Sequence, residues 1–210
     1  FIVLCLPETN HRTNAPCVFS ASKGIRNVQT AFSEKNVRQT YLASMLYMFG
    51  FYFFISFFGI FLVARFGLSE VSIGNCYGFI GVLMVVTQMI IVRIISKRYD
   101  ARTTLRYSLF AVSAAMVIFP FAPTMNILYA FLPFYAIPQG VSMVSINALV
   151  STSVPDTKQG KALGIQSSFM AFSQSIVPLI AGFSSAFISI HAPFIAGAIF
   201  VAAAWMILFL

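Results

Sequence analysis

The chain has 210 residues, of which 59% are hydrophobic and 9% are charged, against about 25% charged in ordinary soluble domains. Its 24 Phe exclude an ordinary soluble domain, because a chain of this length could not bury so much apolar surface. The formal net charge is +8, but long apolar stretches interrupt the cations. We therefore predict membrane lipids with anionic headgroups as their partners and no nucleic acid.

The first residues predict a membrane segment followed by a loop. Residues 1–6 are apolar and end at Pro7 and Glu8, which indicates the end of an upstream transmembrane helix. The chain begins without an initiator Met, so we expect it to be part of a longer protein. Residues 7–38 are polar without a sustained apolar period, which predicts a cytosolic central loop.

Six apolar stretches follow, and about 20 apolar residues suffice for a helix to cross the hydrocarbon core. We predict an all-α polytopic membrane protein whose residues 41–210 form a six-helix bundle of three antiparallel hairpins. The predicted spans are about 41–64, 71–95, 104–121, 126–150, 160–188 and 193–210. Ser69 and Glu70 are typical of a helix start, and Pro120 and Pro123 should break the end of the third span.

The positively charged residues are concentrated in alternate loops between the predicted spans. All of the 13 Lys and Arg except Arg65 lie before the first span, or within or directly beside every second connection. Positive residues next to a span are retained in the cytosol during insertion. The pattern predicts an integral multi-pass protein, with the cell membrane as the expected location and residues 7–38, 96–103 and 151–159 in the cytosol.

Polar side chains and one methionine near the middle of the predicted spans are the candidates for lining a substrate cavity. At 1.5 Å rise per residue, Tyr52, Met84, Gln139 and Gln174 lie near the bilayer centre. A proline beside them leaves a backbone carbonyl without its helical hydrogen bond. Inside a bilayer such a carbonyl is tolerated mainly where it lies next to other protein or to a water-filled cavity. Asn147 joins the candidates nearer the cytosolic end, where a gate and a packing role are both open. For the glutamines, hydrogen bonds between helices are an equal alternative.

Charged side chains are missing at depth in the predicted spans, because Arg93 and Arg106 lie close enough to the boundary to snorkel. A proton relay normally needs such a group, so a proton-coupling carboxylate is expected in the part of the protein outside this sequence. Neither His191 nor the three Cys stand in a catalytic or metal-binding pattern. We predict no enzyme, no catalytic residue, no metal and no cofactor.

Two sets of small residues predict close helix packing. Gly74 and Gly78 share one helix face, as do Gly160, Gly164 and Ser168, because both sets have four-residue spacing. Small residues allow helix backbones to approach each other. We favour packing over a ligand role for both sets.

Four motifs together are similar to the C-terminal half of major facilitator superfamily transporters, in the branch of tetracycline-resistance and multidrug:proton antiporters. They are Leu6-Pro7-Glu8-Thr9, the stretch from Arg65 to Gly74, the stretch from Thr87 to Arg102 with its basic loop, and Val154-Pro155 followed by Gly160, Gly164, Ser168, Pro178 and Gly182. The resemblance covers essentially all 210 residues. Within the basic loop, Arg93, Lys97 and Asp100 depart from the family motif, so only Arg98 and Arg102 carry over as cytosolic gating-loop cations.

The resemblance implies two six-helix halves that rock against each other and expose a substrate site alternately to each face. It favours a secondary active transporter that moves a small organic molecule, by efflux in exchange for protons. A nutrient symporter or facilitator on the same fold is the alternative, since fold alone does not define direction or substrate. A non-transporting membrane receptor is a further alternative from another class.

Overall fold

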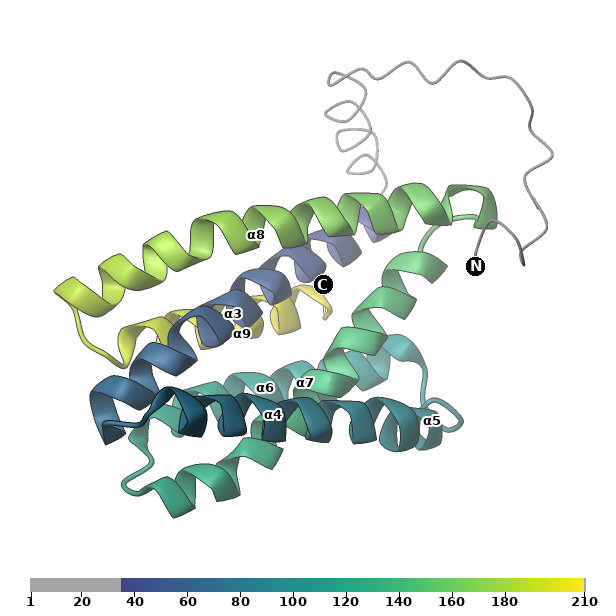
Figure 1. The fold of residues 1–210 in the computed structure, drawn as a ribbon. Helices are drawn as coiled ribbons and strands as arrows, with labels where there is room; N and C mark the ends of the chain where they lie inside the picture. Colours follow the sequence, from purple (N-terminus) through teal and green to yellow (C-terminus); the bar gives the residue numbers. More distant parts are fainter. Residues whose placement is uncertain (1–34, 210) are drawn as a thin grey trace, which may run out of the picture.

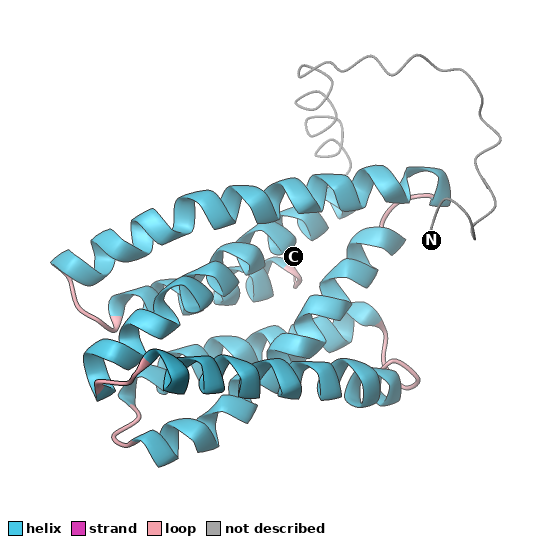
Figure 2. Cartoon of the chain, in the orientation of Figure 1, coloured by secondary structure: helices cyan, strands magenta, loops and turns pink. Residues whose placement is uncertain are grey.

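The computed structural model describes residues 35–209, and all of their regular structure is helical (Figures 1 and 2). The predicted all-α fold is confirmed for this part of the chain. The predictions for residues 1–6 and for most of the loop at 7–38 lie outside the described residues.

The helices alternate in direction, with short connections between them, and all but the four-residue α5 are long. In chain order they are α3 (Lys35–Phe66), α4 (Glu70–Val86), α5 (Val92–Ile95), α6 (Ala101–Ile118), α7 (Met125–Thr152), α8 (Gln159–Phe187) and α9 (Ala192–Ile207). A π-helical turn, η1 (Thr87–Ile91), joins α4 to α5 within one continuous helical rod. Two short 3₁₀ turns, η2 (Phe119–Phe121) and η3 (Asp156–Lys158), follow α6 and precede α8.

The helix ends differ from the predicted spans mainly at α3 and α9. Helix α3 is already helical at Lys35, the first described residue, which lies inside the stretch predicted as loop and before the predicted span start at Tyr41. Residues 35–40 contain neither Pro nor Gly, so the helix continues beyond the apolar stretch into a region where water and headgroups solvate polar side chains. Helix α9 ends at Ile207, within the stretch predicted to run to residue 210.

Local capping explains where two of the helices start. Gly67 has φ +62°, a conformation that glycine adopts without strain. Its N–H donates to the Val63 carbonyl at 2.8 Å, which ends α3 and turns the chain. Ser69 then caps α4, as predicted, and the Asp100 carboxylate caps α6 by accepting from the N–H groups of Arg102 and Thr103 at 3.1 and 3.2 Å.

Helix α3 is the central helix of the bundle. It packs against α9, α8 and α7, while α6 packs against α7 and α9, and α4 packs against α7. Figure 1 shows α8 and α4 along opposite sides of the bundle with α3 between them. Consequently most side chains of α4 and α8 are exposed, whereas much of α3 is buried.

One end of the bundle is held by stacked and edge-to-face rings, which we call the aromatic cluster: Phe54, Phe58, Phe61, Phe119 and Phe194. Neighbouring centroids within it lie between 5.1 and 6.1 Å apart, and each side chain is at most 1% exposed. Since lipid tails are as apolar as these rings, the cluster stabilises the bundle by close packing and ring geometry rather than by removing apolar surface from water.

Within residues 35–209, five helical segments are long and apolar enough to cross a membrane: Val37–Phe66, Glu70–Ile95, Ala101–Phe121, Met125–Thr152 and Asp156–Phe187. Helix α9 has 16 residues, about 24 Å at 1.5 Å per residue. Every described cationic side chain except Arg65 lies at the end of the bundle where α5 meets α6 and α7 meets α8. We refer to this end as the predicted cytosolic end.

Candidate functional site

A buried hydrogen bond joins α3 and α7 at mid-bundle. Gln139 Nε2 donates to Tyr47 Oη at 2.8 Å, and both side chains are 1% exposed. Gln139 lies at the middle of α7. The bond ties the two helices together through neutral groups.

Around this bond, several polar atoms lack a protein partner. Ser44 Oγ, Thr87 Oγ1, Tyr135 Oη and Gln139 Oε1 are all buried and form no hydrogen bond with another described residue. A buried polar group left unpaired costs about 1–3 kcal/mol, and such groups in a native fold call for an explanation. We call Ser44, Tyr47, Thr87, Tyr135 and Gln139 the buried polar cluster.

Helix geometry brings these residues onto facing surfaces. Ser44 and Tyr47 are three residues apart on α3, and Tyr135 and Gln139 are four apart on α7, so each pair shares one helix face. Thr87 approaches from η1: a Cβ placed on Gly140 would lie 3.1 Å from Thr87 Cγ2. Glycine at that position therefore permits the close contact between α7 and η1.

The backbone next to the cluster is irregular on both sides. In η1 the Val92 N–H donates to the Thr87 carbonyl, five residues earlier, which defines a π-turn. Such turns within α-helices occur frequently at functional sites. On α7, Pro138 directly precedes Gln139 and has no N–H to donate to the helix. Both features interrupt the regular α-helical hydrogen bonding beside the site.

Chemically, the buried polar cluster offers hydroxyl and amide groups and no charge. It can donate to and accept from a small polar group of a ligand, or from water, within an apolar surrounding. In the described part of the chain, His, Cys, Asp and Glu form no group that could hold a metal ion.

The other predicted cavity residues do not join this cluster. Tyr52 is 6% exposed and packs with Phe53 and Val177 in a second group between α3 and α8. Met84 is half-buried against the main core, on the turn before Thr87. Gln174 is exposed on α8.

Asn147 forms a separate link near the predicted cytosolic end. Its Oδ1 accepts a hydrogen bond from Gln166 Nε2 at 2.7 Å, which joins α7 to α8. Gln166 is 4% exposed whereas Asn147 is exposed. For this pair the hydrogen bond between helices, one of the two alternatives, is the contact that forms.

The two predicted gating-loop cations have different environments. Arg98 is exposed in the turn between α5 and α6. Arg102 is half-buried, and its guanidinium donates to the Leu208 carbonyl at 3.1 Å at the end of α9. Arg106 donates to the same carbonyl, with its guanidinium over the Phe209 ring at 4.3 Å. Cations at a helix C-terminus complete the bonding of its last carbonyls, so Arg102 has a structural contact in addition to its predicted role.

The glycine faces predicted to pack are open in the described part of the bundle. A Cβ built on Gly74, Gly78, Gly160 or Gly164 would meet nothing within 4 Å. The reason is the position of α4 and α8 at the two edges of the bundle, where these faces point away from the other described helices. Close packing instead occurs between Gly50 of α3 and Gly197 of α9.

Sequence reasoning missed four members of the buried polar cluster: Ser44, Tyr47, Thr87 and Tyr135. The only property of the sequence that pointed to site residues was their depth along the predicted span. Depth does not distinguish Tyr47 or Tyr135 from the residues next to them. Hydroxyl groups can also bond to their own helix, so residue type alone does not distinguish an unpaired Thr87 from a satisfied one.

The fold and the site define an integral, multi-pass, all-helical membrane protein with an uncharged polar site inside the bundle. The sequence model of the Major Facilitator Superfamily matches residues 40–210. No curated protein matches the chain. The match covers most of the chain, so this protein belongs to the Major Facilitator Superfamily and is a membrane transporter. The resemblance to the superfamily is thereby confirmed, and the receptor alternative is set aside.

Proposed function

We propose that the chain is the C-terminal six-helix half of a secondary active transporter. This transporter would move a small organic molecule by alternating access and export it in exchange for protons. The observation that carries the proposal is the Tyr47–Gln139 bond, which lies at mid-bundle with the acceptor Gln139 Oε1 unpaired. A neutral site at this depth suits a substrate that is held by few polar contacts in an apolar surrounding.

The open faces of α4 and α8 support the assignment as one half of a larger fold. Gly74 and Gly78 on one edge helix, and Gly160 and Gly164 on the other, would let a second six-helix half approach closely. Substrate would then lie between the halves, and rocking of one against the other would expose it alternately to each side. This arrangement gives the exposed small residues the packing partner predicted for them.

The candidate residues divide into two groups by exposure. Gln174 and Asn147 are exposed and are proposed to meet substrate directly in the described conformation. Gln139 and Met84 are buried or half-buried, and we propose that they reach substrate when η1 and the Pro138 region of α7 rearrange. Tyr52 is buried between α3 and α8, and we propose that it reaches substrate when α8 moves relative to α3.

The proton-coupling group is proposed to lie on the other half. Acidic residues of the described chain are Glu70, Asp100 and Asp156, and each stands at a helix start rather than within a span. Coupling to protons at depth normally needs an ionisable side chain. A carboxylate facing the Tyr47–Gln139 site from the second half would meet that need.

Transport by the full-length protein in vesicles with an imposed pH gradient tests the function. With a panel of fluorescent amphipathic amines, we expect accumulation against the substrate gradient while protons flow in the opposite direction. Equilibration that ignores the pH gradient would indicate a facilitator, and movement together with protons a symporter. Either result contradicts export by antiport while leaving the transporter class intact.

Substitution of the two glutamines tests the site. Gln139→Ala and Gln174→Ala should each raise the KM for transport at least threefold, because each removes a polar contact to substrate, with little change in expression. Gln159→Ala is the matched control, since Gln159 is a half-buried glutamine at the start of α8, bonded to Asp156 at 2.9 Å and away from the site. Unchanged kinetics in both site variants would reject the assignment.

A further inference from the structure

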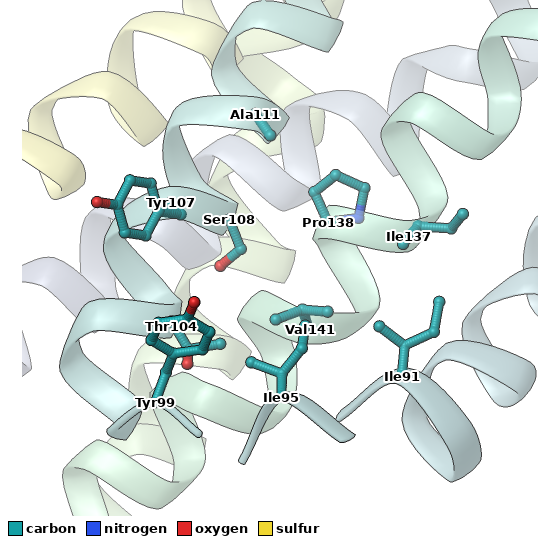
Figure 3. Close-up of a pocket in the computed structure, with 10 residues that line it drawn as sticks. All are labelled: Ile91, Ile95, Tyr99, Thr104, Tyr107, Ser108, Ala111, Ile137, Pro138 and Val141. Carbon is teal, nitrogen blue, oxygen red and sulfur yellow. The ribbon is translucent and has the colours of Figure 1, made fainter. Parts of the chain in front are cut away.

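A groove runs along the surface of the bundle between α5, α6 and α7, apart from the buried polar cluster. Its deeper part is a cavity of about 480 Å³ near the predicted cytosolic end. Figure 3 shows Tyr99 and Thr104 at one end of this cavity and Ala111 and Pro138 at the other. Aliphatic side chains from η1, α5 and α7 form the remaining wall.

The groove continues toward the other end of the bundle. A second cavity of about 600 Å³ shares Ala111, Ile137 and Pro138 with the first and reaches Ile118 and Phe131. From Thr104 to Ile118, α6 advances about 21 Å at 1.5 Å per residue. One leaflet contributes about 15 Å to the hydrocarbon core, so the groove is long enough for one lipid acyl chain.

Its walls suit a hydrocarbon chain rather than a polar ligand. Pro133 and Pro138 of α7 and the small side chains of Ala111 and Ala114 of α6 line the groove, and the short alanine side chains leave space above the contact between the two helices. Exposed Tyr107 forms part of its rim. An unfilled groove would forfeit dispersion contacts along its whole length, and an acyl chain restores them.

The mouth of the groove carries positive charge. Lys97 and Arg98 are exposed in the turn between Ile95 and Tyr99, which both line the cavity. Thr104 Oγ1 lies in the wall, buried and without a hydrogen-bond partner among residues 37–209. The nearby Asp100 carboxylate caps α6 and offsets the charge of one cation, which leaves a net positive charge at the mouth from Lys97 and Arg98.

We infer that this groove binds one anionic phospholipid, with an acyl chain between α6 and α7 and the phosphate at Lys97, Arg98 and the Thr104 hydroxyl. Arg102 and Arg106 are not part of the headgroup site, because their guanidinium groups bind the Leu208 carbonyl. The lipid would hold α5 and the adjacent η1 against α6. It thereby links the lipid composition of the membrane to the π-turn beside the buried polar cluster.

Native mass spectrometry of the delipidated full chain, titrated with dioleoyl phosphatidylglycerol or dioleoyl phosphatidylcholine, tests the inference. For the first bound lipid we expect about tenfold tighter binding of phosphatidylglycerol, as two cations near a phosphate predict. Lys97→Gln with Arg98→Gln should abolish that preference. The matched control, Lys158→Gln with Lys161→Gln, removes the same charge at the same end of the bundle and should keep it.

A second pair of variants tests the groove itself. Ala111→Phe fills the position shared by both cavities and should weaken binding of both lipids at least fivefold. Val117→Phe adds bulk at an exposed position of α6 outside either cavity and should have no effect. The inference is overturned by an equal affinity for the two lipids or by unchanged binding in Ala111→Phe. Competition by inorganic phosphate as strong as by the lipid would also overturn it.

Discussion

Helix α3 passes through two regions that are built on opposite principles. Toward its C-terminal end it contributes Phe54, Phe58 and Phe61 to the aromatic cluster, where rings fill the space between helices. Earlier along the same helix, Ser44 and Tyr47 belong to the buried polar cluster, where four polar atoms have no hydrogen-bond partner among the residues that the structure describes. Both regions are equally buried.

The aromatic cluster contributes to stability, whereas the buried polar cluster provides hydrogen-bonding groups that can bind a ligand. The aromatic cluster has no polar side-chain atom to satisfy, so its contribution comes from packing and ring geometry. The buried polar cluster keeps hydrogen-bonding capacity unused at a cost in stability. A transporter can keep such a cost only in a region that another part of the fold holds in place, and the aromatic cluster with the α3–α9 contact is that part.

The largest expected effect is steric and concerns α9 beside the aromatic cluster. A Cβ on Gly197 would lie 3.0 Å from Phe53 Cβ and 3.1 Å from the Gly50 carbonyl oxygen. Gly197→Leu should therefore cost about 3 kcal/mol of stability by overpacking, measured by thermal unfolding in detergent. Ala130→Leu is the control, because Ala130 is exposed on α7 and has no part in either helix-packing face. Equal losses in both variants would show that the close α3–α9 contact does not control stability.

Removing one ring should have the next largest effect. Phe194 contacts Phe54, Phe61 and Phe119, so Phe194→Ala leaves a cavity within the aromatic cluster. We expect a loss of about 2 kcal/mol in thermal unfolding, less than the upper range for soluble cores because lipid already solvates apolar groups. The transport KM of the folded protein should be unchanged. Phe187→Ala, at a side chain that is 81% exposed, should be neutral in both measurements.

Substitutions in the buried polar cluster should lower transport strongly and stability only a little, the opposite of the result expected for the aromatic cluster. Tyr47→Phe and Gln139→Leu should each cost about 1 kcal/mol, because each leaves its partner unpaired. The double variant should cost less than the sum of the two. Transport, measured as kcat/KM, should fall about tenfold in every variant that lacks Gln139. Additive stability losses with normal transport would make this cluster a second structural region and remove the contrast.

The smallest effect is expected outside both regions, at the cap of α6. Hydrogen bonds from the side chain and N–H of Thr103 lower the pKa of the Asp100 carboxyl. Asp100→Ala should cost about 0.5 kcal/mol at neutral pH, the low end for a lost cap. A lowered folded-state pKa means that this contribution is complete above about pH 4 and is lost as pH falls through the folded-state value. Unfolding curves of the two proteins should therefore converge in acid, and a difference that persists would contradict the capping role.

Much of the helical framework was predictable because membrane helices satisfy their backbone locally. In lipid every span must bond its own N–H and C=O groups, so hydropathy and length locate helices such as α4, which begins at Glu70. Pro120 similarly marks the end of α6, which passes into a 3₁₀ turn at Phe119. The start of α3 was less accessible, since polar residues can extend a helix beyond the membrane without any apolar signal.

The site was predictable only in part. Depth along the span singled out Gln139, whose amide does occupy a buried polar position at mid-bundle. Depth gave no reason to choose Tyr47 or Thr87, because their burial depends on which helices meet there. Depth also placed Gln174 at the same level of the membrane as Gln139. In the structure, however, Gln174 is exposed at an edge of the bundle and Gln139 is buried inside it.

The sequence by itself determined that this protein is a helical membrane protein, where its helices lie and which ends carry positive charge, because these follow from local hydropathy and from residues next to each span. The tertiary structure alone decided which faces meet. Among the described residues it paired Tyr47 with Gln139, left the Thr87 hydroxyl without a hydrogen bond, and packed Gly50 against Gly197 while leaving the face of Gly164 open. The physical reason is that packing between helices in lipid depends on shape and pairwise contacts from distant parts of the chain, which hydropathy does not encode.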